Sequence, residues 1–188
     1  LHYEQAALML SHGKHVLCEK TITSNEAELK ELIRLAGENG TVLMEAMRSV
    51  HEEGFRRLKE VLPMAGTIRR ISFQYAKYSS RYDKFKEGII ENAFNPAFSN
   101  GALMDIGVYC VHPLVRLFGM PKKIIADSLL LSNGVEGAGT ILASYDGMQA
   151  ELLYSKITNN RLPSQIQGED GTLVIDNITN ICSVVFHD

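Results

Sequence analysis

The stretch "NGALMDIGVYCVHPLVRLFG" at 100–119 carries four polar side chains at helical spacing: Asp105, Tyr109, His112 and Arg116. At about 100° per residue, these four positions fall within about 60° of one another on a helix. A carboxylate one turn before a phenol can hold a hydroxyl group and move a proton, which is acid–base chemistry. The stretch therefore predicts a helix with polar residues along one side that could carry out acid–base chemistry.

The rest of this predicted helix is apolar around most of its circumference, which is typical of a buried helix. Its polar stripe must then face solvent, a partner chain or a functional site. Solvated stripes are usually built from Lys, Glu and Gln, whereas this one carries Asp, Tyr and His. We therefore favour a site at Asp105 and Tyr109, and we expect His112 and Arg116 to support the structure.

Three other residues in the stretch predict local features of the helix. Asn100 is expected to cap its first turn. Gly107 leaves a gap through which a backbone or a ligand could approach closely. Pro113 lies in the middle of the pattern and is expected to kink the helix or split it in two.

A second candidate pair, Glu19–Lys20, directly follows the apolar run Val16-Leu17-Cys18. This short run predicts a buried strand over 15–19. Ligands of open α/β sheets bind at the carboxyl ends of the strands, which is where Lys20 lies. For Glu19 two interpretations stay open, namely contact with a bound ligand and partnership with a nearby donor.

Helices and strands alternate in the first 48 residues. The predicted elements are helices over 2–12 and 24–38, and strands over 15–19 and 41–46. Thr23 and Glu26 have the spacing of a capping box, which would open the second helix. Two parallel strands joined by a helix form a right-handed unit, and strands this short and apolar fit a sheet covered on both faces. Residues 1–48 are thus expected to be the final part of a doubly wound sheet whose first strands are missing.

From residue 49 the pattern changes to strands with few helices. A helix over 52–62 is expected to end at Pro63, and strands are predicted over 67–79, 122–132, 139–146, 148–157, 162–170 and 172–178. Such a run predicts a second domain, 49–188, built on an open, mostly antiparallel β-sheet that helices cover on one face. The other face is expected to meet a partner subunit, because a half-apolar sheet seldom stays bare.

The composition excludes several classes of protein. Of 188 residues, 45% are apolar and 22% are charged, as in an ordinary globular protein, and the net charge of −3 gives no case for nucleic acid or an anionic membrane. No apolar run approaches the ~20 residues that span a bilayer. The cysteines, Cys18, Cys110 and Cys182, are far apart in apolar runs, so we expect three buried thiols in a cytoplasmic protein, without disulfides or a zinc site.

Together, "GKHVLCEK" at 13–20 and "GALMDIGVY" at 101–109 resemble the Gfo/Idh/MocA oxidoreductases, and the resemblance covers essentially the whole chain. It implies an N-terminal Rossmann domain that binds NAD or NADP, followed by an α/β substrate domain. It also implies that Lys20 lies beside the nicotinamide, while Asp105 and Tyr109 supply the carboxylate and the acid/base. Tyrosine at 109 is more similar to the dihydrodiol and aldose type than to the inositol dehydrogenase type, which carries His.

The chemistry of hydride transfer agrees with these roles. Negative charge builds on the substrate oxygen, so a proton donor and a cation beside it lower the barrier. We therefore expect Lys20 and Tyr109 to converge on one site, with Asp105 orienting a substrate hydroxyl or the lysine. Glu19 and Lys20 would touch the cofactor. The expected substrate is a sugar, a polyol or a cyclic diol, and the expected partner is another copy, in a homodimer or homotetramer formed through the open sheet.

The chain departs from the family pattern in two ways. The family usually has proline after the lysine, where this chain has Thr21. In addition, no GxGxxG motif follows a strand in these 188 residues, and "GVEGAG" at 134–139 is predicted to be a loop. A dinucleotide needs a glycine-rich turn and a helix N-terminus for its pyrophosphate. The chain is therefore expected to be a fragment, inactive and unable to bind NAD(P) usefully by itself.

Two rival functions stay open, namely a non-catalytic ligand-sensing module on the same scaffold and an oligomerisation domain. The presence of Lys20, Asp105 and Tyr109 favours the enzyme. Arg81 and Tyr82 lie in a polar loop that we expect to be solvated rather than part of a substrate pocket. No metal site is expected, because the histidines have no partners at ligand spacing.

Overall fold

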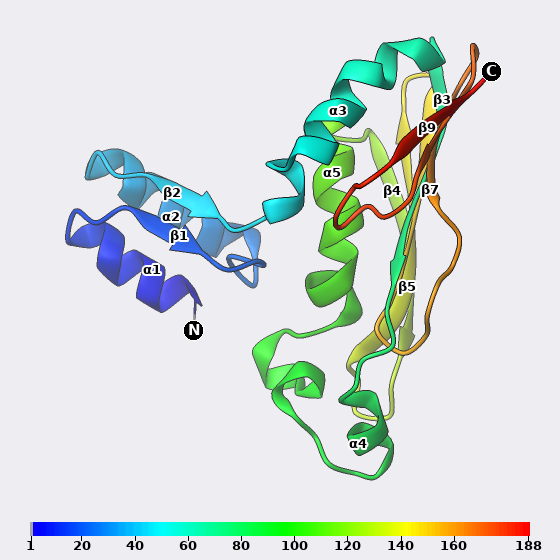
Figure 1. Ribbon diagram of the computed structural model, residues 1–188. Helices are drawn as coiled ribbons and strands as arrows, with labels where there is room; N and C mark the ends of the chain where they lie inside the picture. Colours follow the sequence, from blue (N-terminus) through cyan, green and yellow to red (C-terminus); the bar gives the residue numbers. More distant parts are fainter. Residues whose placement is uncertain (1) are drawn as a thin grey trace. The chain divides into compact units, whose positions relative to one another are not determined.

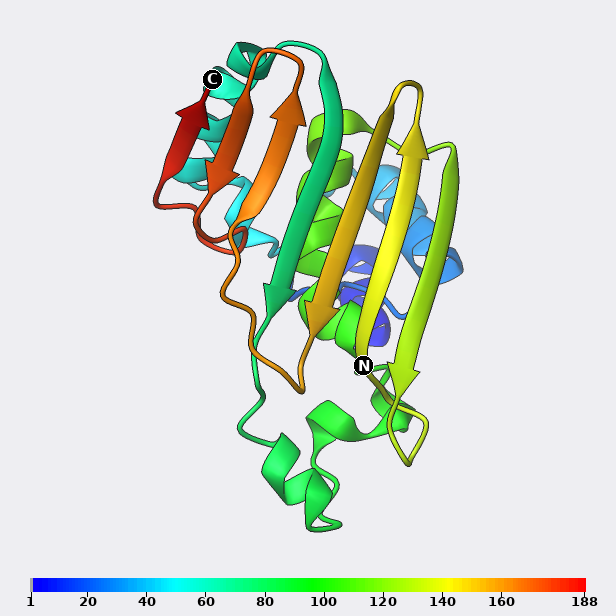
Figure 2. The ribbon, with the colours of Figure 1, turned by 90° about the vertical axis from the view of Figure 1, so that its right-hand side faces the viewer.

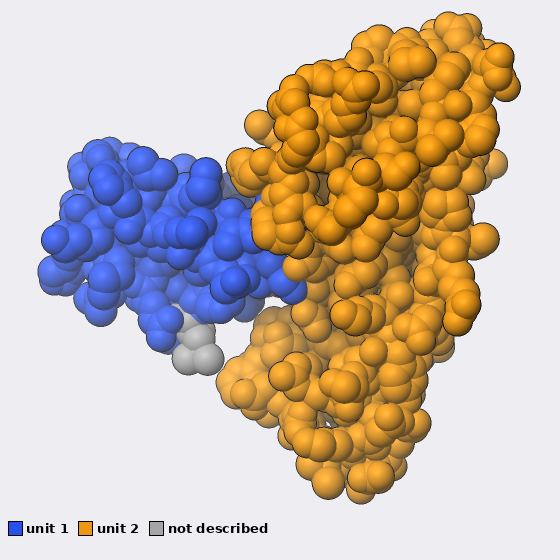
Figure 3. All heavy atoms as spheres, viewed as in Figure 1, with its two compact units in different colours: residues 1–47 blue, residues 48–188 orange. Residues whose placement is uncertain are grey.

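The computed structural model describes residues 2–188. The chain divides into two compact units, Leu1–Met47 and Arg48–Asp188, which are described separately (Figure 3). Among the described residues no helix has the length and apolar character needed to cross a membrane.

The first unit consists of two helices and a small parallel sheet. Its elements are α1 (His2–Ser11), β1 (Val16–Cys18), α2 (Glu26–Glu38) and β2 (Leu43–Glu45). The two strands pair in parallel, with Val16 opposite Leu43, as predicted. The core of this unit contains Leu10, Cys18 and Leu32, all buried. Leu17 and Met44, by contrast, are exposed, so the chain does not cover this sheet fully on both faces.

Helix α2 does not begin with the predicted capping box. Its cap is Asn25, whose side-chain oxygen accepts a hydrogen bond from the Glu28 amide at 2.9 Å. The Glu28 carboxylate in turn accepts one from the Ser24 amide at 3.0 Å. Thr23 is buried, and its hydroxyl donates to the Asn25 carbonyl instead of to the helix. The helix is therefore capped by Asn25, two residues later than the predicted cap Thr23, and the Glu28 carboxylate binds the amide of Ser24 just before the cap.

The second unit is built on one seven-stranded sheet (Figure 2). Its strands, in the order β4-β5-β6-β3-β7-β8-β9, are antiparallel except for the parallel pair β3 and β6. Their bounds are β3 (Ile68–Ala76), β4 (Lys123–Leu130), β5 (Glu136–Tyr145), β6 (Met148–Ser155), β7 (Ser164–Gly168), β8 (Thr172–Ile175) and β9 (Val184–His187). The last of these strands was not predicted.

Except for the short α4 (Tyr82–Lys86), which lies beyond one end of the strands, the helices of this unit lie on one face of the sheet (Figure 1). The helices of the unit are α3 (Glu53–Val61), α4, a π-helical turn η5 (Leu103–Gly107) and α5 (Val108–Phe118), with single 3-10 turns at Arg48–Val50, Leu62–Ala65, Asn92–Phe94 and Pro96–Phe98. Phe73, Leu152, Cys110 and Leu114 are buried between α5 and the sheet. Figure 2 looks onto the opposite face, where no helix of the second unit lies. The expected open sheet with one covered face is confirmed.

The stretch at 134–139 is only partly the predicted loop, because β5 already begins at Glu136. Two of its glycines, Gly137 and Gly139, leave room for neighbouring side chains. A Cβ atom at Gly139 would lie 2.6 Å from Cζ of Tyr154, so only glycine leaves room for that ring. Cys182 also differs from expectation, since it is exposed whereas Cys18 and Cys110 are buried. It lies in the link between β8 and β9, outside any buried strand.

The helix predicted over 100–119 is present, but it begins and continues differently. Asn100 is not its cap; instead, the Glu136 carboxylate accepts a hydrogen bond from the Leu103 amide at 2.6 Å. The first turn widens to π-helical geometry at η5, a distortion that is often found at functional sites. Helix α5 then runs through Pro113 without being split.

Candidate functional site

Asp105 lies on the π-helical turn η5, one turn before Tyr109 on α5. Its side chain is 40% exposed, and one carboxylate oxygen, Oδ2, lies 3.2 Å from Nζ of Lys156. The buried ammonium group of Lys156 thus contacts one side of the carboxylate, and the rest of the carboxylate stays accessible from the surface. It can accept a hydrogen bond from a hydroxyl group of a bound molecule.

Lys156, which the sequence analysis missed, directly follows β6 and is only 1% exposed. Its Nζ donates hydrogen bonds to the carbonyl oxygens of Ala93 at 2.6 Å and Asn100 at 2.9 Å, and it lies 4.6 Å from the centroid of the Phe94 ring. The sequence does contain a pattern that indicates its burial. Every second residue of β6 faces the core, as Leu152 and Tyr154 do, and Lys156 is the next residue in that series.

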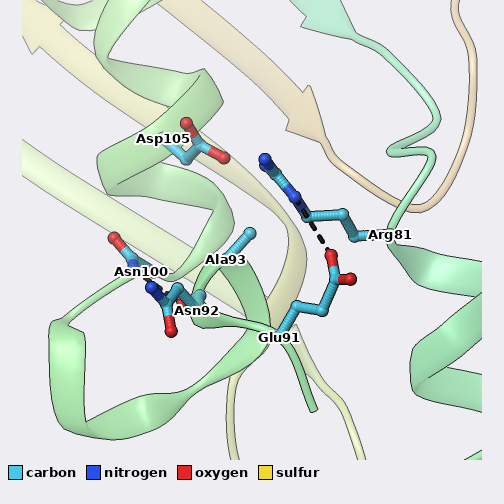
Figure 4. Close-up of a pocket in the computed structure, with 6 residues that line it drawn as sticks. All are labelled: Arg81, Glu91, Asn92, Ala93, Asn100 and Asp105. Carbon is cyan, nitrogen blue, oxygen red and sulfur yellow. Dashed lines mark hydrogen bonds and ion pairs between the residues drawn. The ribbon is translucent and has the colours of Figure 1, made fainter. Parts of the chain in front are cut away.

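A cavity of about 530 Å³ opens beside Asp105. Its lining consists of Arg81, Glu91, Asn92, Ala93, Asn100 and Asp105 (Figure 4). Nε of Arg81 lies 3.2 Å from a Glu91 carboxylate oxygen, and the guanidinium of Arg81 points toward Asp105 across the cavity. Carboxylate, amide and guanidinium groups offer both acceptors and donors, which suits a ligand rich in hydroxyl groups.

The cavity adds to the interpretation of Arg81 and supplies a role for Tyr82. Arg81 is solvated as expected, with 59% of its side chain exposed, but it also lines the cavity, which was not expected. Tyr82 begins α4 and stacks on Phe94 with ring centroids 5.7 Å apart, in contact with the ring that lies under Lys156. The loop before the helix motif is therefore an ordered wall of the cavity.

Tyr109 packs edge-on against Tyr75 of β3, with ring centroids 5.6 Å apart and an interplanar angle of 78°. Burial raises the pKa of the Tyr75 phenol, the charges of Tyr109 and Asp105 raise it further, and a hydrogen bond with Thr179 partly opposes them. Tyr75 therefore stays a neutral phenol beside the two residues that the sequence singled out. Asp105 and Tyr109 are brought together on one side of one helix, as predicted.

Glu19 and Lys20 follow β1 in the first unit. The Glu19 carboxylate accepts a hydrogen bond from the Lys20 amide at 3.2 Å, and the Lys20 side chain is half-buried. The Lys20–Thr21 peptide bond is cis, and a ring nitrogen of His2 lies 3.1 Å from the Thr21 carbonyl oxygen. The convergence of Lys20 with Tyr109 joins residues of the two units and stays a prediction.

Ion pairs between charged side chains lie on the exposed side of the helix at the start of the second unit. Arg56 forms ion pairs with Glu53 and Glu60 on the exposed side of α3, and Arg48 pairs with Glu52. No group of three His, Cys, Asp or Glu side chains with the arrangement of a metal site occurs within residues 2–188.

Two family descriptions match the chain. Residues 55–174 match the family described as GFO/IDH/MocA C-terminal domain, and residues 1–47 match the one described as oxidoreductase family, NAD-binding Rossmann fold.

Relatives with curated names are similar over most of the chain. A scyllo-inositol 2-dehydrogenase (NADP(+)) of Bacillus subtilis is 54% identical over 178 residues, which are 95% of this chain and 54% of that protein. A trans-1,2-dihydrobenzene-1,2-diol dehydrogenase of Mus musculus is 34% identical over 78% of this chain and 43% of that protein. The chain thus spans about half the length of these relatives. The relatives include both inositol and dihydrodiol dehydrogenases.

Solved structures share the fold. An aldose–aldose oxidoreductase from Caulobacter crescentus, solved with glycerol, has a TM-score of 0.83 at 21% identity and covers 99% of this chain and 56% of its own. A 3-ketoreductase from Actinomadura kijaniata, solved with NADP and TDP-benzene, has a TM-score of 0.84 at 24% identity and covers 96% of this chain and 55% of its own. At these identities the likeness establishes the fold alone.

Proposed function

The chain belongs to the Gfo/Idh/MocA family of oxidoreductases, and from that premise we propose that the intact protein transfers a hydride between NAD or NADP and a sugar, polyol or cyclic diol. The observation that carries the proposal is the Asp105 carboxylate. This carboxylate forms an ion pair with the buried ammonium group of Lys156 and lines a polar cavity. It lies one helical turn before Tyr109.

A ring-shaped polyol or diol is the substrate that the site and the relatives together support best. The cavity wall offers a guanidinium, two carboxylates and two carboxamides, which can bind several neighbouring hydroxyl groups. The names of the two curated relatives both describe cyclic molecules with adjacent hydroxyls. Asp105 would accept a hydrogen bond from the hydroxyl beside the reacting carbon and so fix the ring in place.

Tyr109 would move the proton of the reacting oxygen. As the substrate alcohol is oxidised, its hydroxyl proton must leave, and a phenol one turn from the orienting carboxylate can take it up as phenolate and return it in the reverse direction. Lys20 would polarise the same oxygen with its positive charge. Tyr75, a neutral phenol edge-on to Tyr109, would limit the directions that the Tyr109 ring can take.

The residues at the end of β1 fit the nicotinamide end of a dinucleotide. Strands β1 and β2 are parallel, so their carboxyl ends lie at one edge of the sheet, and Glu19 and Lys20 follow β1 there. When bound, NAD(P) supplies the hydride acceptor or donor. Glu19 and Lys20 would hold that end, whereas no glycine-rich turn for the pyrophosphate occurs in residues 2–47.

The proposal is tested by replacing Tyr109 with Phe in the intact protein. Turnover is followed as NADPH formation with scyllo-inositol, trans-1,2-dihydrobenzene-1,2-diol and glucose. Because the variant lacks the proton-transfer group, kcat should fall about 10²- to 10⁴-fold while the cofactor still binds. Tyr145→Phe is the matched control, since it removes only the hydrogen bond from the Tyr145 hydroxyl to the Gly119 carbonyl. An unchanged kcat in Tyr109→Phe would refute the role of Tyr109. Ligand binding without any turnover by the unmutated protein would favour the ligand-sensing alternative.

A further inference from the structure

The most unusual side chain in the second unit is Lys156, a lysine that is 1% exposed. Lysine is almost never fully buried unless its charge is paired, because leaving water is costly for an ammonium. Its position follows from strand alternation, since Leu152 and Tyr154 of β6 are buried on the same face of the sheet. A hydrophobic residue would fill this place at lower cost, so the charge itself calls for an explanation.

The three protons of the ammonium match three acceptors. These are the Ala93 carbonyl at 2.6 Å, the Asn100 carbonyl at 2.9 Å and the Asp105 carboxylate at 3.2 Å. The Phe94 ring adds a cation–π contact, with Nζ 4.6 Å from the ring centroid. These four contacts together offset the free-energy cost of removing the ammonium group from water.

All three acceptors belong to residues that line the cavity. Ala93 and Asn100 belong to the link between α4 and η5, and Asp105 belongs to η5. The ammonium group of Lys156 therefore connects the link between α4 and η5 to η5 itself. It lies behind the cavity lining, because Lys156 is buried and does not line the cavity. The Asp105 side chain keeps 40% of its surface exposed.

We propose that Lys156 is a positioning residue of the reaction, which fixes the Asp105 carboxylate so that a cyclic polyol meets a preformed acceptor. This inference rests on the proposed function. It assigns the orientation of Asp105 to Lys156, a residue for which the sequence predicted no role. Without the ammonium, Asp105 can turn toward solvent or toward Arg81, and the substrate hydroxyl then meets a carboxylate that must first be ordered.

A double-mutant cycle in the intact protein tests this role. Lys156→Met keeps the length and removes the charge, and Asp105→Asn removes the group that Lys156 is proposed to fix. Lys156→Met alone should lower kcat/KM for scyllo-inositol by about ten- to a hundredfold, mainly through KM, with KM for NADP unchanged. In the Asp105→Asn background the same change should cost less than about twofold, because the two residues act as a unit.

The control is Lys122→Met, which removes an exposed lysine paired with Asp146 and should leave the kinetics unchanged. Thermal unfolding of each variant shows that it is folded at the assay temperature. If Lys156→Met does not fold, Lys156→Gln takes its place, because its amide still donates to the two carbonyls. Equal losses in both backgrounds would mean that Lys156 does not act through Asp105 and would overturn the inference alone. No turnover of any polyol or diol by the unmutated protein would overturn the proposed function and this role with it.

Discussion

The three cysteines of the chain differ in how far their thiol groups are buried. Cys18 and Cys110 are buried, and Cys182 is exposed. Removal from water raises the pKa of the Cys110 thiol to about 12. Burial also raises the pKa of the Cys18 thiol, and the nearby charges of Glu45 and Glu19 raise it further. The two buried groups thus stay protonated thiols at neutral pH.

Alkylation of the folded intact protein by iodoacetamide at neutral pH should modify Cys182 first. The thiolate is the reactive form, so Cys18 and Cys110 should react only after unfolding. Peptide mapping by mass spectrometry assigns each modified site, so cysteines elsewhere in the protein do not interfere. Cys182→Ser should abolish the early reaction. Modification of Cys110 in folded protein as fast as that of Cys182 would contradict the expected burial.

The residues of the candidate site differ in how far the sequence reveals them. Asp105 and Tyr109 could be predicted, because the spacing that places them on one side of a helix is local. Lys156 could not be assigned in this way, since its three acceptors lie 51 to 63 residues away in the chain. The alternation of buried Leu152 and Tyr154 did point to it, and a lysine at the next inward position is a signal that was overlooked.

The start of the helix that carries Asp105 is fixed by the sheet beneath it. The ring of Tyr154 lies against Gly107 at the end of η5 and against Gly139 of β5. The Tyr154 hydroxyl donates to Glu136 at 3.0 Å, and the same carboxylate accepts from the Leu103 amide. One aromatic side chain and one carboxylate therefore set the distance between helix and sheet.

Replacement of Gly107 by Ala should destabilise the second unit by about 1–3 kcal/mol, because the new methyl group overpacks the core. Its Cβ would lie 2.8 Å from Cγ of Tyr154 and 3.0 Å from Cδ1 of Leu103. Urea unfolding measures the change. The matched control is Gly37→Ala in helix α2, where nothing lies within 4 Å of the new Cβ, and it should stabilise its own unit by about 0.5–1 kcal/mol. Equal effects of the two substitutions would argue against close packing at Gly107.

The helices and strands of the second unit could be predicted where neighbouring residues in the sequence determine them. Six of its seven strands were predicted, the one over 67–79 from alternation, and the helix was predicted from its spacing. The beginning of β5 was not predicted, because glycines at 137 and 139 are typical of a loop. In the structure they leave room for Ile157 and Leu131 at Gly137 and for the Tyr154 ring at Gly139. The helix start was assigned to Asn100, since a capping carboxylate from Glu136, 33 residues away, leaves no local pattern.

At the scale of the molecule, the uncovered face of the large sheet carries a patch of apolar side chains. Ile125 and Leu142 face each other across β4 and β5, and Leu129 and Leu153 lie on the same face. All four are exposed. Exposed apolar side chains on an uncovered sheet face are typical of an interface, so we propose that a second copy of the protein covers this face.

Light scattering on the intact protein tests the proposed self-association. The unmutated protein should have the mass of a dimer or tetramer, and Leu142→Glu should lower that mass, because a charge buried in an apolar interface is unpaired. Met120→Glu is the control, since Met120 is 76% exposed in the link after α5, and it should leave the mass unchanged. A monomeric unmutated protein, or an oligomer that Leu142→Glu does not affect, would rule out this face as the interface.

Cofactor affinity should depend on residues that these 188 do not contain. The first unit offers Glu19 and Lys20 at the end of β1, but no glycine-rich turn that leads from a strand into a helix. Backbone amides at such a helix N-terminus bind the pyrophosphate, and the rest of the dinucleotide gains little without them. A fluorescence titration of the 188-residue chain with NADPH should therefore show no saturable binding at micromolar concentrations, whereas the intact protein binds under the same conditions. Circular dichroism and cooperative unfolding establish that the chain used is folded. Micromolar affinity in the 188-residue chain would show that Lys20 and its neighbours hold the cofactor without a glycine-rich turn.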